Sequence, residues 1–177
     1  MRYAITACRL DALLLLIYIC WRKRSLLLSG ALAAAPLPFG DDAGDFKPQL
    51  FSNLIEIDLG FAFRYSRDGD ADTFSQMNIS MNGSVEVSLS QKSETKSLIY
   101  CVFCIANGTV NGTVWHRRMH RKEDLDRVGT LVYTNVTHAF LVTWDRVISN
   151  QGENTFQLVF VQNAQSSFAI YILVKGR

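Results

Sequence analysis

FLVTWDRVISNQGENTFQLVFV, residues 140–161, carries the clearest structural pattern in the chain. Every second residue is large and apolar before the polar break SNQGEN and again after it, at Phe140, Val142, Trp144, Phe156, Leu158 and Phe160. Alternation with a period of two is typical of a strand that buries one face. The stretch therefore predicts two half-buried strands joined by a turn, with their aromatic rings in a core. We also expect the amides of Asn154 and Gln157 to tie this turn to nearby backbone.

Shorter alternating runs lie on both sides of this hairpin, at residues 55–63, 77–81, 85–89 and 168–174. Asn82-Gly83 separates two of them and is a strong hairpin signal, because the favoured turn needs positive φ at both central positions. Other segments carry other signals. Residues 67–72 and 107–112 indicate loops, residues 99–106 are apolar throughout and indicate a strand covered on both faces, and residues 113–115 indicate the start of a further strand.

One short helix is predicted near residues 122–133. Leu125, Val128 and Val132 recur at spacings of three and four, and two acidic residues occupy the first turn, where the helix dipole favours them. Together the patterns predict a mainly β (α+β) fold, an antiparallel β-sandwich-like domain of about six to eight strands.

Length and composition limit the class of protein. A chain of 177 residues provides one domain of ordinary size with some extra length. The net charge of +2 gives no reason to expect nucleic acid as a partner. Of the four cysteines, Cys8 and Cys20 lie in the N-terminal segment discussed next, so too few remain for a disulfide scaffold, and the core has to be hydrophobic.

The N-terminal segment has the features of a targeting sequence. Its first apolar run, residues 12–21, is much shorter than the roughly 20 residues of a membrane-spanning helix. A basic triplet and LLLSGALAAAP follow, in the order of a secretory signal that ends near Ala33 or Ala35. We therefore expect residues 1–35 to be a signal peptide or, because an apolar run precedes the triplet, a signal-anchor-like segment. Residues 36–177 form the β domain, and the mature chain is expected to have no stable membrane span.

N-glycosylation acceptors support a secreted, extracellular protein. Five N-x-S/T triplets without proline occur after the N-terminal segment, and each of their asparagines is a candidate glycan site. Polar turns rich in Asn, Gly and Thr are the alternative explanation. The candidates are Asn78, Asn82, Asn107, Asn111 and Asn135.

A second motif suggests metal binding. Cys101-x2-Cys104-x11-His116-x3-His120 is close to the spacing of a two-cysteine, two-histidine zinc finger. The intervening residues IANGTVNGTVW do not resemble the packed helix of such a finger, and strand residues three apart face opposite sides. Two buried thiols or a disulfide therefore remain the structural interpretation, and an intracellular zinc-binding nucleic-acid module remains the alternative function.

HRRMHRK, residues 116–122, concentrates positive charge beside a tryptophan. It is a candidate anion-binding patch for a sulfated polysaccharide or another anionic partner, or else a solvated turn before the helix. The patch comprises His116, Arg117, Arg118, His120, Arg121 and Lys122.

Catalytic motifs are not found. Residues 68–79 begin like a calcium loop but lack its glycine and its final glutamate. There is no Gly-x-Ser-x-Gly, no phosphate loop and no histidine paired with a nucleophile. We therefore predict no enzyme and no cofactor.

Several motifs resemble the NIDO domain, the extracellular domain of nidogen, alpha-tectorin and a large membrane mucin. PFGDDAGD (38–45), MNGSVEVSL (81–89), GTVWHR (112–117), VTWDRV (142–147) and NTFQLVF (154–160) occur in its order and approximate spacing. The family's Pro-Phe-Trp-Ala-Asp-like segment is replaced by VFCIA at residues 102–106. The matched core positions are Phe39, Gly40, Gly83, Trp144, Asn154, Phe156 and Gln157.

The resemblance implies a non-enzymatic module of cell-matrix adhesion or matrix assembly. Its expected partners are extracellular matrix or cell-surface proteins, with sulfated polysaccharide as a further candidate.

Overall fold

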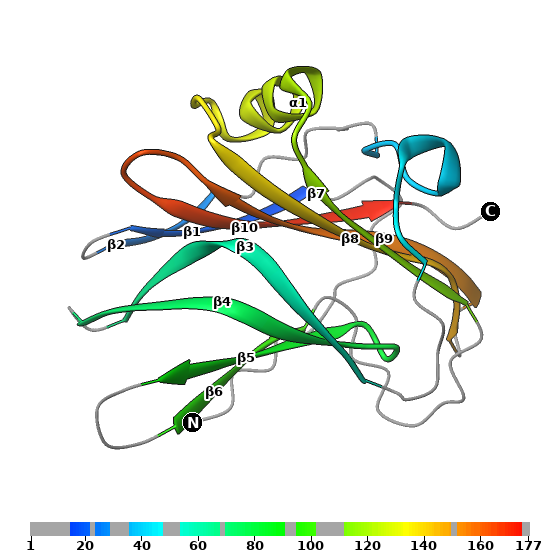
Figure 1. The fold of residues 1–177 in the computed structure, drawn as a ribbon, viewed down its shortest axis with the longest axis horizontal. Helices are drawn as coiled ribbons and strands as arrows, with labels where there is room; N and C mark the ends of the chain where they lie inside the picture. The colour runs from blue at the N-terminus through cyan, green and yellow to red at the C-terminus, as the bar shows by residue number, and fades with distance from the viewer. Residues whose placement is uncertain are drawn as a thin grey trace.

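The computed structural model describes residues 15–21, 24–28, 36–47, 54–67, 70–90, 95–101, 112–149 and 152–174. In this part of the chain, ten strands form two antiparallel sheets that face each other (Figure 1). The six-stranded sheet has the order β2-β1-β10-β9-β8-β7, and the four-stranded sheet has the order β3-β4-β5-β6. The mainly β, antiparallel class predicted from the sequence is confirmed.

The strands β3 to β10 number eight, within the expected range, and the other two lie in the segment for which a leader was predicted. The elements are β1 (Leu15–Trp21), β2 (Arg24–Leu28), η1 (Asp41–Ala43), β3 (Leu54–Arg67), β4 (Asp70–Ser80), β5 (Ser84–Ser90), β6 (Thr95–Cys101), β7 (Thr113–Met119), α1 (Lys122–Val132), β8 (His138–Ser149), β9 (Gly152–Gln162) and β10 (Ser167–Val174).

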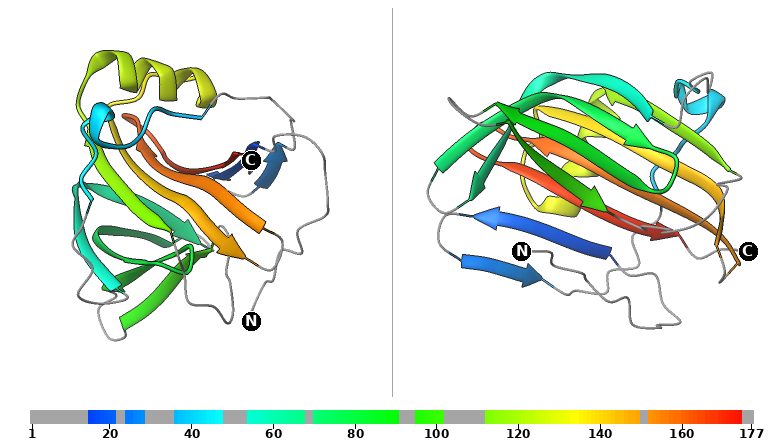
Figure 2. Two further views of the ribbon diagram at one scale, coloured as in Figure 1. Left: turned by 90° about the vertical axis from the view of Figure 1, so that its right-hand side faces the viewer. Right: turned by 90° about the horizontal axis from the view of Figure 1, so that it is seen from below.

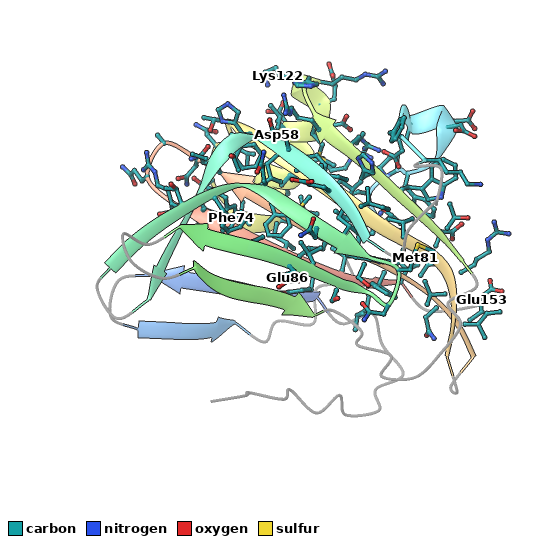
Figure 3. All side chains as sticks on the ribbon, turned by 60° about the horizontal axis from the view of Figure 1, so that its bottom comes forward. Asp58, Phe74, Met81, Glu86, Lys122 and Glu153 are labelled. Atoms are coloured by element: carbon teal, nitrogen blue, oxygen red, sulfur yellow. The ribbon has the colours of Figure 1, made fainter. Side chains whose placement is uncertain are left out.

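An inner core fills the space between the two sheets. Phe63 of β3 meets Phe160 of β9 edge to face, with ring centroids 5.2 Å apart, and Phe74 of β4 contacts both rings. Figure 3 shows Phe74 pointing from the four-stranded sheet into this space. Trp144 stacks on Phe156 at 5.2 Å, and both are fully buried. The aromatic residues that alternate in the sequence therefore form the inner core, as predicted.

An outer core covers the opposite face of the six-stranded sheet. Leu141, Val159 and Ile170 project to this side and are fully buried under α1 and residues 36–47. Figure 2 shows α1 on the face of the sheet that points away from β3 to β6. The prediction of two half-buried strands was therefore wrong for β8 and β9, which are buried on both faces. The residues between the alternating aromatics are themselves mostly apolar, as a strand covered on both faces requires.

The hairpins of the four-stranded sheet follow the local signals closely. At the Asn82-Gly83 turn, Gly83 has φ +86°, and the Asn82 side chain accepts hydrogen bonds from the Ser84 amide at 3.1 Å and hydroxyl at 2.7 Å. The hairpin prediction is confirmed. The loop predicted at residues 67–72 is shorter, because Arg67 already pairs with Asp70.

Other boundaries differ by a few residues. The return strand predicted from residue 113 continues to Met119 as β7, and α1 matches the predicted helix. The strand predicted at residues 99–106 is β6, which begins at Thr95 and ends at Cys101. It pairs with β5 and is the last strand in the order of the four-stranded sheet. Residues 102–106 and the predicted turn at 107–111 lie outside the described residues.

Candidate functional site

Residues 36–47, here called the strap, cross the outer face of the six-stranded sheet and reach β7. The sequence PLPFGDDAGDFK has no periodic pattern, so side chains of the sheet have to hold it. Gln157 provides the first anchor: its Oε1 accepts from the Leu37 amide at 2.9 Å, and its Nε2 donates to the Leu37 carbonyl at 2.9 Å. Nε2 also donates to Thr143 Oγ1 at 3.1 Å, and the Gln157 side chain is fully buried.

These contacts decide the roles predicted for the two amides. Asn154 Nδ2 donates to the Gly152 carbonyl at 2.9 Å, so Asn154 does hold the turn between β8 and β9. Gln157 does not hold the turn, because its amide bonds to Leu37 of the strap on the outer face of the sheet. The prediction for Gln157 was wrong. The missed signal was a glutamine at a position that faces a covered, apolar surface.

A buried ion pair provides the second anchor of the strap. Arg117 Nη1 contacts Asp45 Oδ1 and donates to the Pro38 carbonyl at 2.8 Å. Asp45 Oδ2 accepts from the Gly40 amide at 2.7 Å. The exposed fractions of the two charged side chains are 7% and 0%. Arg117 is therefore part of the packing between β7 and the strap, with Asp124 of α1 at 3.8 Å from its Nη2.

The strap ends by pairing with the outer edge of β7. The amide of Phe46 donates to the His116 carbonyl at 2.8 Å, and the amide of His116 donates to the Phe46 carbonyl at 3.1 Å. Next to this bridge Phe46 is 62% exposed. Lys47 Nζ lies 5.4 Å from the centre of the Trp115 ring, a cation–π distance.

An open cleft of about 340 Å³ lies where β7 faces β3. Arg118 spans the two sheets there: its Nε donates to the Leu59 carbonyl at 2.8 Å and its Nη2 reaches the Asp58 carbonyl at 3.5 Å. The guanidinium lies directly on Gly60, which has φ +73° at a register shift between β3 and β4. A Cβ at that position would fall 1.6 Å from Arg118 Cζ. The positive φ therefore favours glycine at this position, and a side chain there would have to displace the Arg118 guanidinium.

His116 forms the apolar side of the cleft. Its ring stacks on Phe140 with centroids 5.8 Å apart and lies 5.2 Å from Phe46. Its Nε2 is buried without a hydrogen-bond partner among the described residues. Burial lowers the pKa of His116 below its usual value, and the charge of Asp45 partly opposes that shift. Burial at the cleft therefore favours the neutral form of the imidazole.

The predicted anion-binding patch is divided by the strand that carries it. All three β7 residues border the cleft, but the side chain of Arg117 bonds to the strap at Asp45, because neighbouring residues of a strand point to opposite sides. His120, Arg121 and Lys122 are exposed at the turn into α1, where Lys122 extends into solvent (Figure 3). The exposed charges thus gather at this turn, beside the cleft.

The residues of the predicted zinc motif are only partly described. Cys101 ends β6, and the placement of its side chain and of Cys104 lies outside what the structure describes. Within the described part of the chain, no three His, Cys, Asp or Glu side chains form a group that could hold a metal ion.

The predicted glycan sites differ in their surroundings. Asn135 is exposed in the connection between α1 and β8, Asn78 is half-buried on β4, and Asn82 is half-buried in its turn. Asn107 and Asn111 lie outside the described residues.

Comparison with protein families identifies this arrangement. The model of the nidogen-like domain matches residues 75–175, more than half of the chain. The chain belongs to the nidogen-like domain family. This is a family of extracellular modules, and the resemblance seen in the sequence motifs is confirmed. Comparisons with curated proteins and with solved structures give no significant match.

Motif residues of the nidogen-like domain act here as connections between parts of the fold. Trp144 Nε1 donates to the Ser80 carbonyl at 2.8 Å, linking β8 to the end of β4, and the Gly83 amide donates to the same carbonyl. Gln157 holds the strap, which lies upstream of the matched residues. Among the described residues, no helix is long and apolar enough to cross a bilayer.

Proposed function

We propose that the chain is a secreted, non-enzymatic module of cell-matrix adhesion or matrix assembly. The observation that carries the proposal is the match to the nidogen-like domain over residues 75–175, because this family consists of extracellular modules. Its partners would be extracellular matrix or cell-surface proteins. The roles of the motif residues are consistent with this proposal, since Trp144 and Gln157 are buried and bonded within the fold.

Secretion would follow from a leader within residues 1–35 and would bring glycosylation of the sequons. Asn135 is the best-placed acceptor, because its side chain is exposed beside α1 and belongs to neither core. Asn82 is a weaker acceptor, because its side-chain oxygen already accepts two hydrogen bonds within the turn.

The surface we assign to an anionic partner is the turn into α1 together with the cleft. His120, Arg121 and Lys122 are exposed there, and Arg118 places a further charge at the cleft. A sulfated polysaccharide fits this surface, because its sulfate groups bind best where several cationic side chains lie close together. Charges attract each other appreciably only within about one Debye length, near 8 Å at physiological salt. Phe46 adds an exposed apolar contact beside them.

The test begins with the full chain expressed in a secretory host. We expect it in the medium, with a mass that falls on endoglycosidase treatment, and we expect cells to attach to surfaces coated with it. Retention in the cell with one bound zinc and no glycan would refute the proposal and support the zinc-binding alternative.

Charge-removing variants test the binding surface. Arg121→Ala with Lys122→Ala should weaken heparin binding by about tenfold at physiological salt and reduce its salt dependence. Stability should be unchanged, because the Lys122–Asp126 pair is exposed and such pairs contribute little. Arg64→Ala with Arg127→Ala removes the same charge from other exposed positions and is the matched control. Equal losses in both pairs would show only a dependence on net charge.

A further inference from the structure

Strand β10 lies between two strands in this structure. On one side it pairs with β9 over eight residue pairs, from Ser167↔Gln162 to Val174↔Thr155. On the other side it pairs antiparallel with β1, from Leu15↔Ile172 to Tyr18↔Ala169. Figure 2 shows β1 and β2 beside β10 at this end of the six-stranded sheet.

The sequence of β10 is that of an interior strand. SFAIYILV contains no charge and no proline, and Ile170 and Ile172 are buried while Tyr171 and Leu173 are half-buried. Edge strands in soluble proteins usually carry charges, prolines or bulges that prevent pairing with other chains. A strand without any of these features requires a neighbour on each side.

The other end of the same sheet shows the contrast. Strand β7 has the sequence TVWHRRM and carries two charged residues, Arg117 and Arg118. The strap also pairs with its edge through Phe46 and His116. This edge is therefore protected by charge and by a covering segment, whereas β10 depends on β1 alone.

Strand β1 belongs to the segment that we propose to be removed on secretion. We propose that, once it is removed, the free edge of β10 is a strand-acceptor site for an extended, uncharged, apolar segment of another protein, added antiparallel in place of β1. This inference rests on the proposed secretion. The chemistry of the segment follows from the strand that occupies the edge here, LLIYICW, which is aliphatic and aromatic and carries no charge.

Strand addition would obtain its affinity from the main chain and its selectivity from the side chains. Hydrogen bonds to the β10 backbone would extend the sheet by one strand, as in other cases of β-strand addition. Alternate side chains of the added strand would reach the two sides of the sheet, next to the inner core at Tyr171 and the outer core at Ile172. A charged residue on either side would be costly there.

The experiment uses the protein as secreted from the full-length chain, with its N-terminus established by mass spectrometry. The probe is a labelled peptide of residues 15–21 with Cys20→Ser and a short lysine tail for solubility. We expect saturable binding by fluorescence anisotropy. Two further peptides are N-methylated at Leu16 or at Ile17. Adjacent amides of a strand point to opposite sides, so one methylation should weaken binding about tenfold or more and the other should have little effect.

Each outcome decides a separate point. If residues 1–35 remain on the secreted chain, the leader proposal fails and the edge stays occupied by β1, which overturns the inference as well. If they are removed and the peptide does not bind, or both methylations act equally, only the strand-acceptor site is refuted. If the secreted protein forms a dimer that excludes the peptide, the edge takes a second copy of the chain instead of a partner segment.

Discussion

The contact between Gln157 and Leu37 gives the sharpest prediction for stability. In Gln157→Leu the side chain keeps a similar size but loses three hydrogen bonds, and the buried Leu37 amide and carbonyl lose their partners. An unpaired buried polar group costs about 1–3 kcal/mol, so two of them would cost about 2–6 kcal/mol. The start of the strap can avoid part of that cost by detaching at Leu37 while Asp45 keeps its contact with Arg117, which exposes Leu37 at a loss of about 1.5–3 kcal/mol.

The cheaper response sets the observed effect. We therefore expect the free energy of unfolding of Gln157→Leu to fall by about 2–3 kcal/mol, with the strap released at Leu37 and the two sheets intact. Urea denaturation measures the first part. Limited proteolysis within residues 36–47 measures the second, since a released strap should be cleaved before the rest of the domain.

The control is Gln76→Leu, the same substitution at an exposed position of β4, which should change stability by less than about 0.5 kcal/mol. A loss below about 1 kcal/mol in Gln157→Leu, with the strap still resistant to protease, would show that water or another group replaces the glutamine. The reasoning about the strap would then be refuted.

Three further predictions concern the strap and the cleft. Asp45→Asn leaves the buried Arg117 without its nearest counter-charge and should reduce the unfolding free energy by about 3 kcal/mol in urea, while a loss under 1 kcal/mol would show that the pair is dispensable. Gly60→Ala imposes φ +73° on an alanine and should lower the free energy of unfolding by about 1–2 kcal/mol, even when Arg118→Ala removes the neighbouring side chain. Full recovery of stability in the double variant would contradict backbone strain as the cause. The pKa of His116 is lowered in the folded state, so the unfolded chain binds more protons and the free energy of unfolding should fall as the pH drops below about 6.5. His116→Gln should reduce the dependence of this free energy on pH between about pH 7.5 and 5.5. An unchanged dependence would assign it to other groups.

Local patterns in the sequence predicted the elements and the inner core. The alternation through Phe140 and Trp144 and the Asn82-Gly83 pair each depend on residues close in the chain, where the strand period and the turn geometry act directly. What they could not predict were contacts between distant segments. Leu37 and Gln157 are 120 residues apart, and the strap between residues 36 and 47 has no period of its own.

The sequence indicated some of the residues at the candidate site but not their arrangement. HRRMHRK was treated as one patch because its charges are adjacent in the sequence. Once β7 continues to Met119, the period of two separates buried Arg117 from exposed Arg118, and the residues after the strand remain together at the surface. Extending the predicted strand by four residues would have revealed the division. The pairing of Arg117 with Asp45 would still have required the fold.

The two surfaces proposed here lie on opposite ends of one sheet, and they depend on the N-terminal segment differently. The turn into α1 and the cleft adjoin β7, whose edge is held by the strap through Phe46, Asp45 and Gln157-bound Leu37. All of these residues follow the proposed leader, so its removal leaves that surface unchanged. Strand β10 lies toward the other end, beyond β8 and β9, and would lose its neighbour β1 when the leader is removed. Binding of an anionic partner to this surface should therefore persist after leader removal, whereas strand addition should require that removal.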